Sequence, residues 1–282
     1  MPKVFKIACL QTRPLPTFSE ALNEAIGLAE EAVKQGADFI TLPEYCGGMK
    51  TKGSSLIPPA EIEQNHPVLN GLIDFAIKSK IFILVGSIAI SGPKNKIYNR
   101  SFIIDNNGVI LSRYDKIHMF DIDLSKNEIY RESDKVINGK NITVCKTDFG
   151  NLGQTVCYDL RFPSLYRELS QAGAEILFVP AVFTKKTGEA HWHVLNRARA
   201  IENGAFIVAP CAFGNVEGGG SGYGHSIIVN PWGEVISDAG EGKGIIYATI
   251  NLDEVDTARR KIPSLSHDKA FELNLDKKKD VA

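Results

Sequence analysis

The segment KQGADFITLPEY, residues 34–45, contains a turn at Gly36, a short apolar run and a proline followed directly by a glutamate. The same order of turn, apolar run and proline returns in QAGAEILFVPAV, residues 171–182. Each segment follows a predicted helix, as expected for a helix–strand unit of a layered α/β protein. The likeness suggests two similar α/β halves with packed sheets, although any helix–glycine–strand unit would share this pattern.

Strand-like and helix-like segments alternate on both sides of these two units. Helices are expected over 19–34, 66–80, 162–172, 188–203 and 253–260. Strands are expected over 4–11, 37–42, 81–90, 98–104, 109–114, 141–146, 152–156, 175–179, 205–210, 226–229, 234–237 and 244–250. Ser19 is the expected N-cap of the first helix, and Asn107-Gly108 marks a hairpin turn. The alternation predicts an α/β fold, and because no flexible linker divides the chain, we expect one domain over 1–282.

The composition is that of an ordinary soluble globule, with 282 residues, 44% hydrophobic and 23% charged. A net charge of −1 gives no electrostatic support for nucleic acid or an anionic membrane as partner. Lys277–Lys279 is flanked by aspartates and is interpreted as a solvated tail. No apolar run approaches the roughly 20 residues that span a bilayer, and the start of the sequence does not resemble a signal peptide.

The cysteines are odd in number and widely spaced, without a CxxC pair, which favours a reducing, cytoplasmic location. Four of them lie mainly in apolar runs and are predicted to be structural: Cys9, Cys46, Cys145 and Cys211. The fifth, Cys157, lies in GQTVCYDLRFPSLYREL, residues 153–169, where a β-prone run gives way to a turn and a helix. Such a turn lifts a nucleophile out of a sheet and places backbone N–H groups beside it. A buried structural cysteine is the alternative.

Two other ionisable side chains lie where α/β proteins place reactive groups. Glu44 follows a buried strand, and the ends of strands carry the reactive groups of such folds. A solvated loop acid is the alternative for this residue. Lys116 ends a hairpin strand in SRYDKIHMFDID, residues 112–123, and can equally be a surface lysine. His118, two residues further on, competes with it for the role of catalytic base.

Together and in this order, LPEY, YDKIHMF and VCYDLRFP resemble the segments that carry the Glu–Lys–Cys triad of the nitrilase, or carbon–nitrogen hydrolase, superfamily. YRES, residues 130–133, is similar to the family segment with a second active-site glutamate, here Glu132. Further similar segments at 188–206 and 222–235 extend the resemblance to about residues 4–265. CYDLRFP and AHWHVLNRARAIE are most similar to the amidase branch of ω-amidases and deaminated-glutathione amidases, with a slight preference for the latter.

The resemblance implies a four-layer α-β-β-α sandwich, often assembled as a homodimer through its α faces. It implies that Glu44 is the general base and that Cys157 is the nucleophile that forms a thioester. Lys116 and the backbone N–H of Tyr158 would hold the oxyanion. Glu132 would hold the lysine and shape the electrostatics of the pocket. No metal or organic cofactor is required, and the partners are the amide substrate and water.

The branch implies hydrolysis of the terminal carboxamide of a small carboxylate-bearing substrate to an acid and ammonia. Deaminated glutathione is the preferred substrate, with 2-oxoglutaramate or 2-oxosuccinamate as alternatives. Arg161 is the candidate partner of the substrate carboxylate, because a guanidinium binds a carboxylate through two hydrogen bonds. A structural arginine is the alternative at this position. Thr187 and His191 are candidates to line the pocket.

Other interpretations stay open. His191 and His193 are two positions apart on a predicted helix and point to nearly opposite sides, so we expect no metal there. The glycines of 218–222 lack the Lys-Ser/Thr of a P-loop and predict a flexible loop near the site mouth. A Cys–His hydrolase with His118 or His225 as base, a non-catalytic scaffold, a nitrilase, an N-carbamoyl hydrolase and an acyl transferase are the rival functions.

Overall fold

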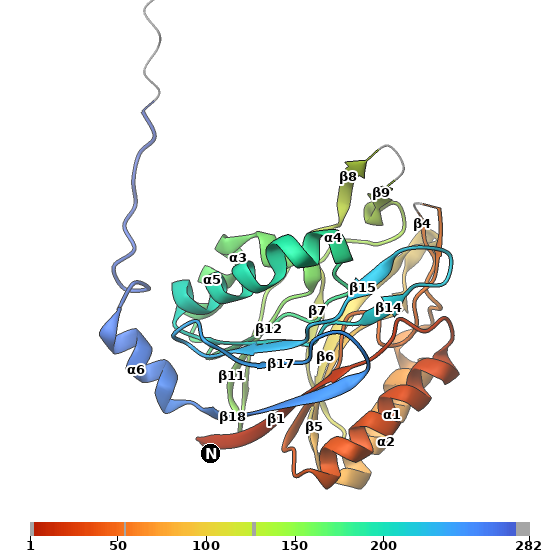
Figure 1. Ribbon diagram of the computed structural model, residues 1–282, viewed down its shortest axis with the longest axis horizontal. Helices are drawn as coiled ribbons and strands as arrows, with labels where there is room; N and C mark the ends of the chain where they lie inside the picture. The colour runs from red at the N-terminus through yellow and green to blue at the C-terminus, as the bar shows by residue number, and fades with distance from the viewer. Residues whose placement is uncertain (1–2, 54, 126–127, 275–282) are drawn as a thin grey trace, which may run out of the picture.

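The computed structural model describes residues 3–53, 55–125 and 128–274, so the tail at Lys277–Lys279 lies outside the described residues. Two six-stranded mixed sheets lie face to face (Figure 1). The first has the order β18-β1-β2-β5-β6-β7, with β1 Val4–Gln11, β2 Phe39–Thr41, β5 Phe82–Ser91, β6 Ile97–Ile104, β7 Ile110–Asp115 and β18 Gly244–Asn251. The second has the order β10-β11-β12-β13-β16-β17, with β10 Val144–Thr147, β11 Gly150–Gln154, β12 Ile176–Phe178, β13 Phe206–Ala209, β16 Ile227–Val229 and β17 Val235–Asp238.

Helices cover the outer face of each sheet. α1 (Phe18–Lys34) and α2 (Pro67–Ser79) bury their apolar sides against the first sheet. α3 (Pro163–Gln171) and α5 (His193–Asn203) do the same on the opposite side of the molecule, against the second sheet (Figure 1). The two sheets share an apolar core between them. These layers confirm the α-β-β-α sandwich.

The two similar segments of the sequence form equivalent units. β2 and β12 are both inner strands with a parallel neighbour on each side. The turns before them use glycines in the left-handed region, with φ of 78° at Gly36 and 98° at Gly173, where a side chain would be strained. The rings of Phe39 and Phe178 meet between the sheets with centroids 5.5 Å apart. The inner strands of the two units therefore pack directly against each other.

The structure corrects the predicted helices at two places. α1 begins at Phe18, and its N-cap is Thr17, whose Oγ1 accepts the backbone N–H of Glu20, so the prediction of Ser19 as cap is wrong. The helix expected over 188–203 consists of a π-helical segment (Gly188–Trp192) followed by α5, and a short helical turn, α4 (Lys185–Thr187), precedes it. A final helix, α6 (Asp253–Lys261), follows β18.

Small hairpins that the sequence did not predict surround one end of the sandwich. They are β3 (Thr51–Lys52) with β4 (Ser55–Leu56), β8 (Asp121–Ser125) with β9 (Glu128–Arg131), and β14 (Phe213–Asn215) with β15 (Ser221–Tyr223). Short 3₁₀ turns cover Glu63–Asn65, Pro93–Asn95, Glu132–Asp134 and Cys157–Arg161. Across the described ranges, no helix combines the length and the apolar character needed to cross a membrane.

Candidate active site

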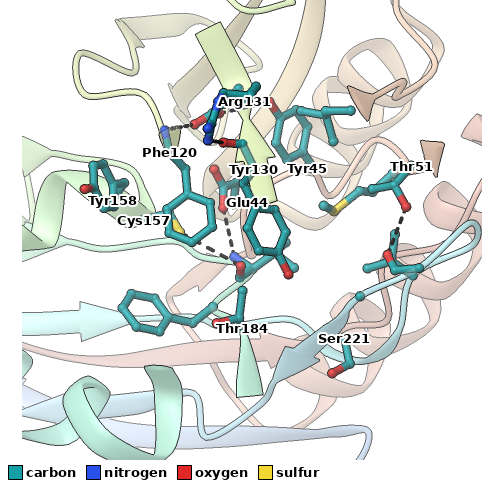
Figure 2. A pocket seen from close by; sticks show the side chains of 18 of the residues that line it. Glu44, Tyr45, Thr51, Phe120, Tyr130, Arg131, Cys157, Tyr158, Thr184 and Ser221 are labelled. Atoms are coloured by element: carbon teal, nitrogen blue, oxygen red, sulfur yellow. Dashed lines mark hydrogen bonds between the residues drawn. The ribbon is translucent and has the colours of Figure 1, made fainter. Parts of the chain in front are cut away.

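A cavity of about 670 Å³ lies at the end of the sandwich where several strands finish. Glu44 follows β2, Lys116 follows β7 and Cys157 follows β11, and all three side chains line this cavity. Figure 2 shows Glu44 and Cys157 on its inner wall and Arg131 near the outer hairpin. The topology thus brings together the three residues that the sequence predicted as a triad, together with Glu132.

The segment that carries Glu44 crosses close to β5 at Gly86, and this contact fixes the position of its backbone. An added Cβ at Gly86 would lie 1.9 Å from the carbonyl oxygen of Leu42, so only glycine allows this crossing. Glu44 is buried, with 4% of its surface exposed. Its Oε1 accepts Lys116 Nζ at 2.9 Å, and its Oε2 accepts the backbone N–H of Val182 at 2.9 Å. Because Val182 follows β12, this carboxylate bridges the two sheets.

Lys116 places a buried ammonium between two carboxylates. Its Nζ lies 2.9 Å from Glu44 Oε1 and 2.8 and 3.0 Å from the two oxygens of Glu132. Burial alone would lower the pKa of Lys116, but the charges of Glu132 and Glu44 outweigh it and raise that pKa well above its usual value. The lysine therefore stays charged and can stabilise negative charge in the cavity.

Glu132 has its acceptor positions filled. Besides Lys116, it accepts the backbone N–H of Phe120 at 2.7 Å, the Asn99 amide at 3.3 Å and the Tyr45 hydroxyl at 3.4 Å. Burial raises the pKa of Glu132, and the Lys116 charge opposes that rise. A carboxylate bonded on every side is suited to position the lysine and is poorly placed to accept another proton.

Cys157 begins the 3₁₀ turn and has φ of 50°, a conformation that costs a non-glycine residue roughly 1–3 kcal/mol and is typical of functional sites. Its backbone N–H donates to Pro180 O at 2.9 Å, which fixes the strained turn. Within the described residues, no acceptor is bonded to the next N–H, that of Tyr158. Burial, and then the charge of Glu44, raise the pKa of the thiol well above its usual value, and Lys116 opposes them.

The charges decide how this thiol can be activated. One ammonium lies between two carboxylates, so the cluster carries one net negative charge while the thiol is protonated. A free thiolate would add a second negative charge in a buried place, which is costly. Transfer of the thiol proton to Glu44 leaves the net charge unchanged. The arrangement therefore favours general-base activation of Cys157 by Glu44.

Two residues that sequence reasoning missed organise the site. Asn99 is fully buried and donates to both Glu44, at 2.9 Å, and Glu132, at 3.3 Å. Asp159 ties the nucleophile turn to the lysine segment, because it accepts the Val156 N–H, the Tyr114 hydroxyl and two groups of His118. Asp159 stands two positions after Cys157, where a short acidic side chain can bond its own turn, and that signal was present in CYDL.

His118 and His225 do not line the cavity. His118 Nδ1 lies 2.7 Å from Asp159 Oδ1, and its ring stacks on Phe162 with centroids 3.5 Å apart. His225 contacts Asp238 instead. The structure therefore offers neither histidine to Cys157 as a base, which removes the geometric support for a Cys–His hydrolase.

The three predicted substrate-binding residues are divided. Thr187 is buried and lines the cavity. Arg161 and His191 do not line it and contact each other, with Arg161 Nη2 and His191 Nδ1 3.3 Å apart. The Arg161 guanidinium packs over the rings of Tyr158 and Phe183. Arg161 and His191 thus lie outside the lining of this cavity, and their roles in substrate binding stay predictions.

Residues 6–260 match the model of the family described as carbon–nitrogen hydrolase. The fold, the site and this match define a hydrolase that acts on carbon–nitrogen bonds other than peptide bonds, in linear amides. The chain belongs to the carbon–nitrogen hydrolase family, the nitrilase superfamily.

Relatives with named activities cover nearly the whole chain. It is 39% identical over 273 residues to deaminated glutathione amidase of Synechocystis sp., covering 94% of this chain and 98% of that protein. It is 33% identical over 280 residues to Omega-amidase NIT3 of Saccharomyces cerevisiae, covering 96% and 95%. The crystal structure of Saccharomyces cerevisiae Nit3, a member of branch 10 of the nitrilase superfamily, matches with a TM-score of 0.81 and 29% identity, covering 92% of this chain and 94% of that one.

Proposed function

We propose that this protein hydrolyses the ω-amide of a 2-oxo acid, with Cys157 as nucleophile, and that its preferred substrate is deaminated glutathione. Glu44 takes the thiol proton as the sulfur attacks the amide carbon. Negative charge then develops on the carbonyl oxygen, where the Lys116 ammonium and the Tyr158 N–H stabilise it. The placement of these groups around one cavity supports the proposal.

The remaining steps use the same residues. Glu44 returns its proton to the leaving nitrogen, because an amine or ammonia leaves readily only when protonated. A thioester then joins the acyl group to Cys157. Water, deprotonated by Glu44, attacks this thioester and releases the acid and the thiol. Glu132 keeps the lysine in place throughout and exchanges no proton.

The chemistry of the leaving group corrects one expectation from the sequence. In 2-oxoglutaramate the amide is a terminal carboxamide, and hydrolysis releases ammonia. The amides of deaminated glutathione are secondary, so hydrolysis of the ω-amide releases a peptide amine and no ammonia. Both substrates carry the same 2-oxoglutaryl acyl group, so the space available to the leaving group decides between them.

The size of the cavity is the observation that carries the choice of substrate. A volume of about 670 Å³ lies within the roughly 300–1,000 Å³ typical of sites that enclose drug-sized ligands. Deaminated glutathione has twice as many non-hydrogen atoms as 2-oxoglutaramate, and it fills such a space better. The glycine-rich loop at 218–220 and strand β9 line part of this cavity, where a longer leaving group would lie.

Arg131 is the candidate partner for a substrate carboxylate. It lies on β9. Among the described residues that line the cavity, Arg131 and Lys116 are the two that carry a positive charge. Its guanidinium donates to the carbonyl oxygens of Ile122 and Tyr130, and pairs with Asp123 at 2.6 Å. Arg131→Gln should raise KM more than it lowers kcat. Arg161→Gln, outside the cavity, is the matched control and should change KM far less.

The test compares kcat/KM for deaminated glutathione and 2-oxoglutaramate by the appearance of their common product, 2-oxoglutarate. Cys157→Ala serves as the blank, and 2-oxosuccinamate, N-carbamoylputrescine and an aromatic nitrile complete the panel. A higher kcat/KM for deaminated glutathione supports the proposal. A higher value for 2-oxoglutaramate makes the protein an ω-amidase, and activity only on the nitrile or carbamoyl compound refutes the substrate class. Assembly as a homodimer and a cytoplasmic location stay predictions.

A further inference from the structure

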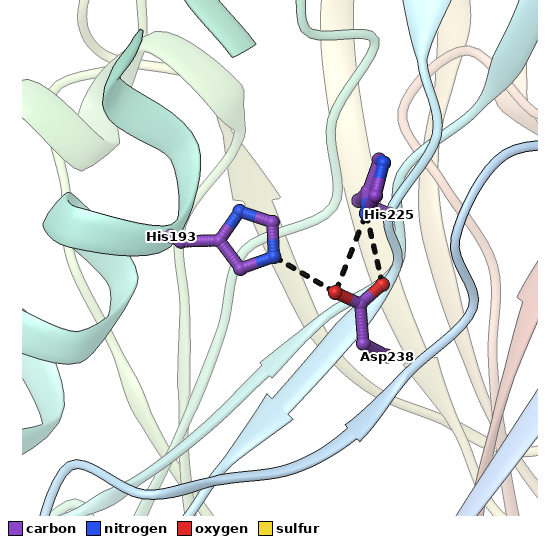
Figure 3. A group of neighbouring side chains, drawn as sticks. All are labelled: His193, His225 and Asp238. Atoms are coloured by element: carbon purple, nitrogen blue, oxygen red, sulfur yellow. Dashed lines mark hydrogen bonds and ion pairs between the residues drawn. The ribbon is translucent and has the colours of Figure 1, made fainter. Parts of the chain in front are cut away.

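A second cluster of polar side chains lies outside the cavity. His193 is the first residue of α5, His225 lies between β15 and β16, and Asp238 is the last residue of β17. Figure 3 shows the two imidazole rings approaching one carboxylate from different sides. None of the three residues lines the cavity at Cys157. The proposed reaction uses none of them.

The three side chains converge on a small volume. His193 Nε2 lies 2.8 Å from Asp238 Oδ2, and His225 Nδ1 lies 3.0 Å from Asp238 Oδ1. One ligand atom from each residue lies within 4.8 Å of those of the other two. Around a tetrahedral zinc ion with bonds of about 2.0–2.1 Å, ligand atoms lie roughly 3.3 Å apart. Small rotations of the side chains would therefore admit an ion in place of the present hydrogen bonds.

The backbone around His225 is fixed in a strained conformation. Its φ is 52°, which a non-glycine residue adopts at a cost of roughly 1–3 kcal/mol. The N–H of His225 donates to Gly240 O at 2.9 Å, and its carbonyl accepts Trp192 Nε1 at 2.7 Å. The imidazole stacks on Tyr223, with centroids 4.5 Å apart and an angle of 22°. These contacts aim Nδ1 at the carboxylate before any ligand binds.

The carboxylate is held in the same way. Asp238 Oδ1 also accepts the backbone N–H of Gly240 at 2.8 Å, so one residue, Gly240, contacts both His225 and Asp238. Outer contacts of this kind orient the ligands of metal sites. The side chains of His193 and Asp238 are each 33% exposed and that of His225 is 23% exposed, so solvent can deliver an ion and complete its coordination.

We propose that His193, His225 and Asp238 bind a divalent transition-metal ion. Two imidazole nitrogens and one carboxylate oxygen suit Zn²⁺ and its neighbours better than Mg²⁺ or Ca²⁺, which prefer oxygen ligands. The ion would join α5, the segment after β15 and the end of β17. Because β15 continues from the glycine-rich loop, the ion stabilises the scaffold behind the outer wall of the cavity and takes no part in the reaction.

The test titrates the intact protein with Co²⁺, whose absorption distinguishes thiolate ligands from nitrogen and oxygen ligands. The test variants are His193→Gln, Asp238→Asn and His225→Asn, since asparagine tolerates positive φ better than most residues. His267→Gln removes an exposed histidine elsewhere and is the matched control. Circular dichroism without metal checks that each variant is folded. Thermal unfolding with and without Zn²⁺ provides the second readout, because a bound ion raises the midpoint.

We expect one equivalent of Co²⁺ to bind without thiolate charge-transfer absorption. Each cluster variant should lose more than about tenfold in affinity, since loss of even an outer partner typically costs 10–100-fold. Zn²⁺ should raise the unfolding midpoint of the natural protein and of His267→Gln, and not that of the cluster variants. Binding that the cluster variants leave unchanged, thiolate absorption from Cys157, or no binding at all would overturn the proposal and leave a hydrogen-bonded His–Asp–His cluster.

Discussion

Replacing Asp159 by asparagine tests whether this buried carboxylate fixes the nucleophile turn. Asp159 Oδ2 accepts the Val156 N–H at 2.8 Å and the Tyr114 hydroxyl at 2.7 Å. Its Oδ1 accepts the His118 N–H at 3.0 Å and faces the ring Nδ1 at 2.7 Å. Asparagine keeps one oxygen and puts an amide group in place of the other, so two of these groups lose their acceptor whichever way the amide turns.

The expected loss follows from counting these groups. The Tyr114 hydroxyl or the ring Nδ1 of His118 can accept from the new amide group, so one backbone N–H, of Val156 or His118, is left without its acceptor. An unsatisfied buried donor costs about 1–3 kcal/mol, and the free energy of unfolding should fall by about that amount. Urea denaturation measures this as a shift of the midpoint at an unchanged slope. Asp121→Asn is the control, because Asp121 also accepts a backbone N–H, from Ser133, but is exposed. It should cost less than about 1 kcal/mol.

The same variant should also lower kcat more than it raises KM, because the turn that carries Cys157 loses its link to the segment of Lys116. Steady-state kinetics on the preferred amide substrate measures the two constants separately. If Asp159→Asn unfolds within about 1 kcal/mol of the natural protein and keeps its kcat, the carboxylate does not hold this turn and our interpretation is wrong.

Three other perturbations probe separate parts of the structure. Lys116→Met should lower kcat about 10²–10³-fold through loss of an oxyanion donor, whereas His118→Asn should retain far more activity, as steady-state kinetics will show. Burial lowers the pKa of His66 to about 4, below its unfolded value of 6.5. The folded state therefore gains stability from the neutral imidazole above pH 6.5 and loses it as the pH falls toward 4. The free energy of unfolding, measured with denaturant, should fall by about 3 kcal/mol between pH 7 and pH 4. Gly86→Ala should lower both the thermal midpoint and kcat, because its Cβ would meet Leu42 O at 1.9 Å.

Control variants distinguish these three predicted effects from nonspecific loss of folding or activity. A greater loss of kcat in His118→Asn than in Lys116→Met would favour the Cys–His mechanism over ours. His66→Asn, which keeps a capping side chain on α2, should lack the acid loss, and an unchanged pH dependence would contradict the assignment to His66. Gly27→Ala lies in α1 with open space around its Cβ and should stabilise by up to about 1 kcal/mol, so a similar fall in both glycine variants would contradict the steric argument.

The fold was predictable because its signals are local. Apolar runs such as 81–90, together with turns such as those at Gly36 and Gly173, predicted where most strands lie. The repeated helix–strand unit indicated paired sheets. The small hairpins escaped because their strands are two to five residues long and partly polar, as in β8, so period-two alternation is weak. The N-cap prediction was wrong because both Thr17 and Ser19 are residue types that cap helices, so residue type alone did not decide between them.

The site was predictable only in part. Glu44, Lys116 and Cys157 stand at ends of strands, where topology collects them, and the family resemblance supplied Glu132. Arg161 was expected in the pocket because a guanidinium suits a carboxylate, and residue type says nothing about the direction of a side chain in a 3₁₀ turn. Likewise, the cluster at His193 joins the first residue of α5 to two residues that the pairing of β16 with β17 brings near each other, so no sequence window contains it.

The hydrogen bond from the Val182 N–H to Glu44 Oε2 runs from one sheet to the other. The proposed base therefore belongs to one half of the molecule and the proposed nucleophile to the other. A chain whose halves docked with a slip of one residue could still bury its apolar faces, yet its acid and thiol would no longer meet. Turnover therefore depends on correct docking of the two sheets. In a partly misassembled preparation, the fraction of active sites would fall before any secondary structure was lost.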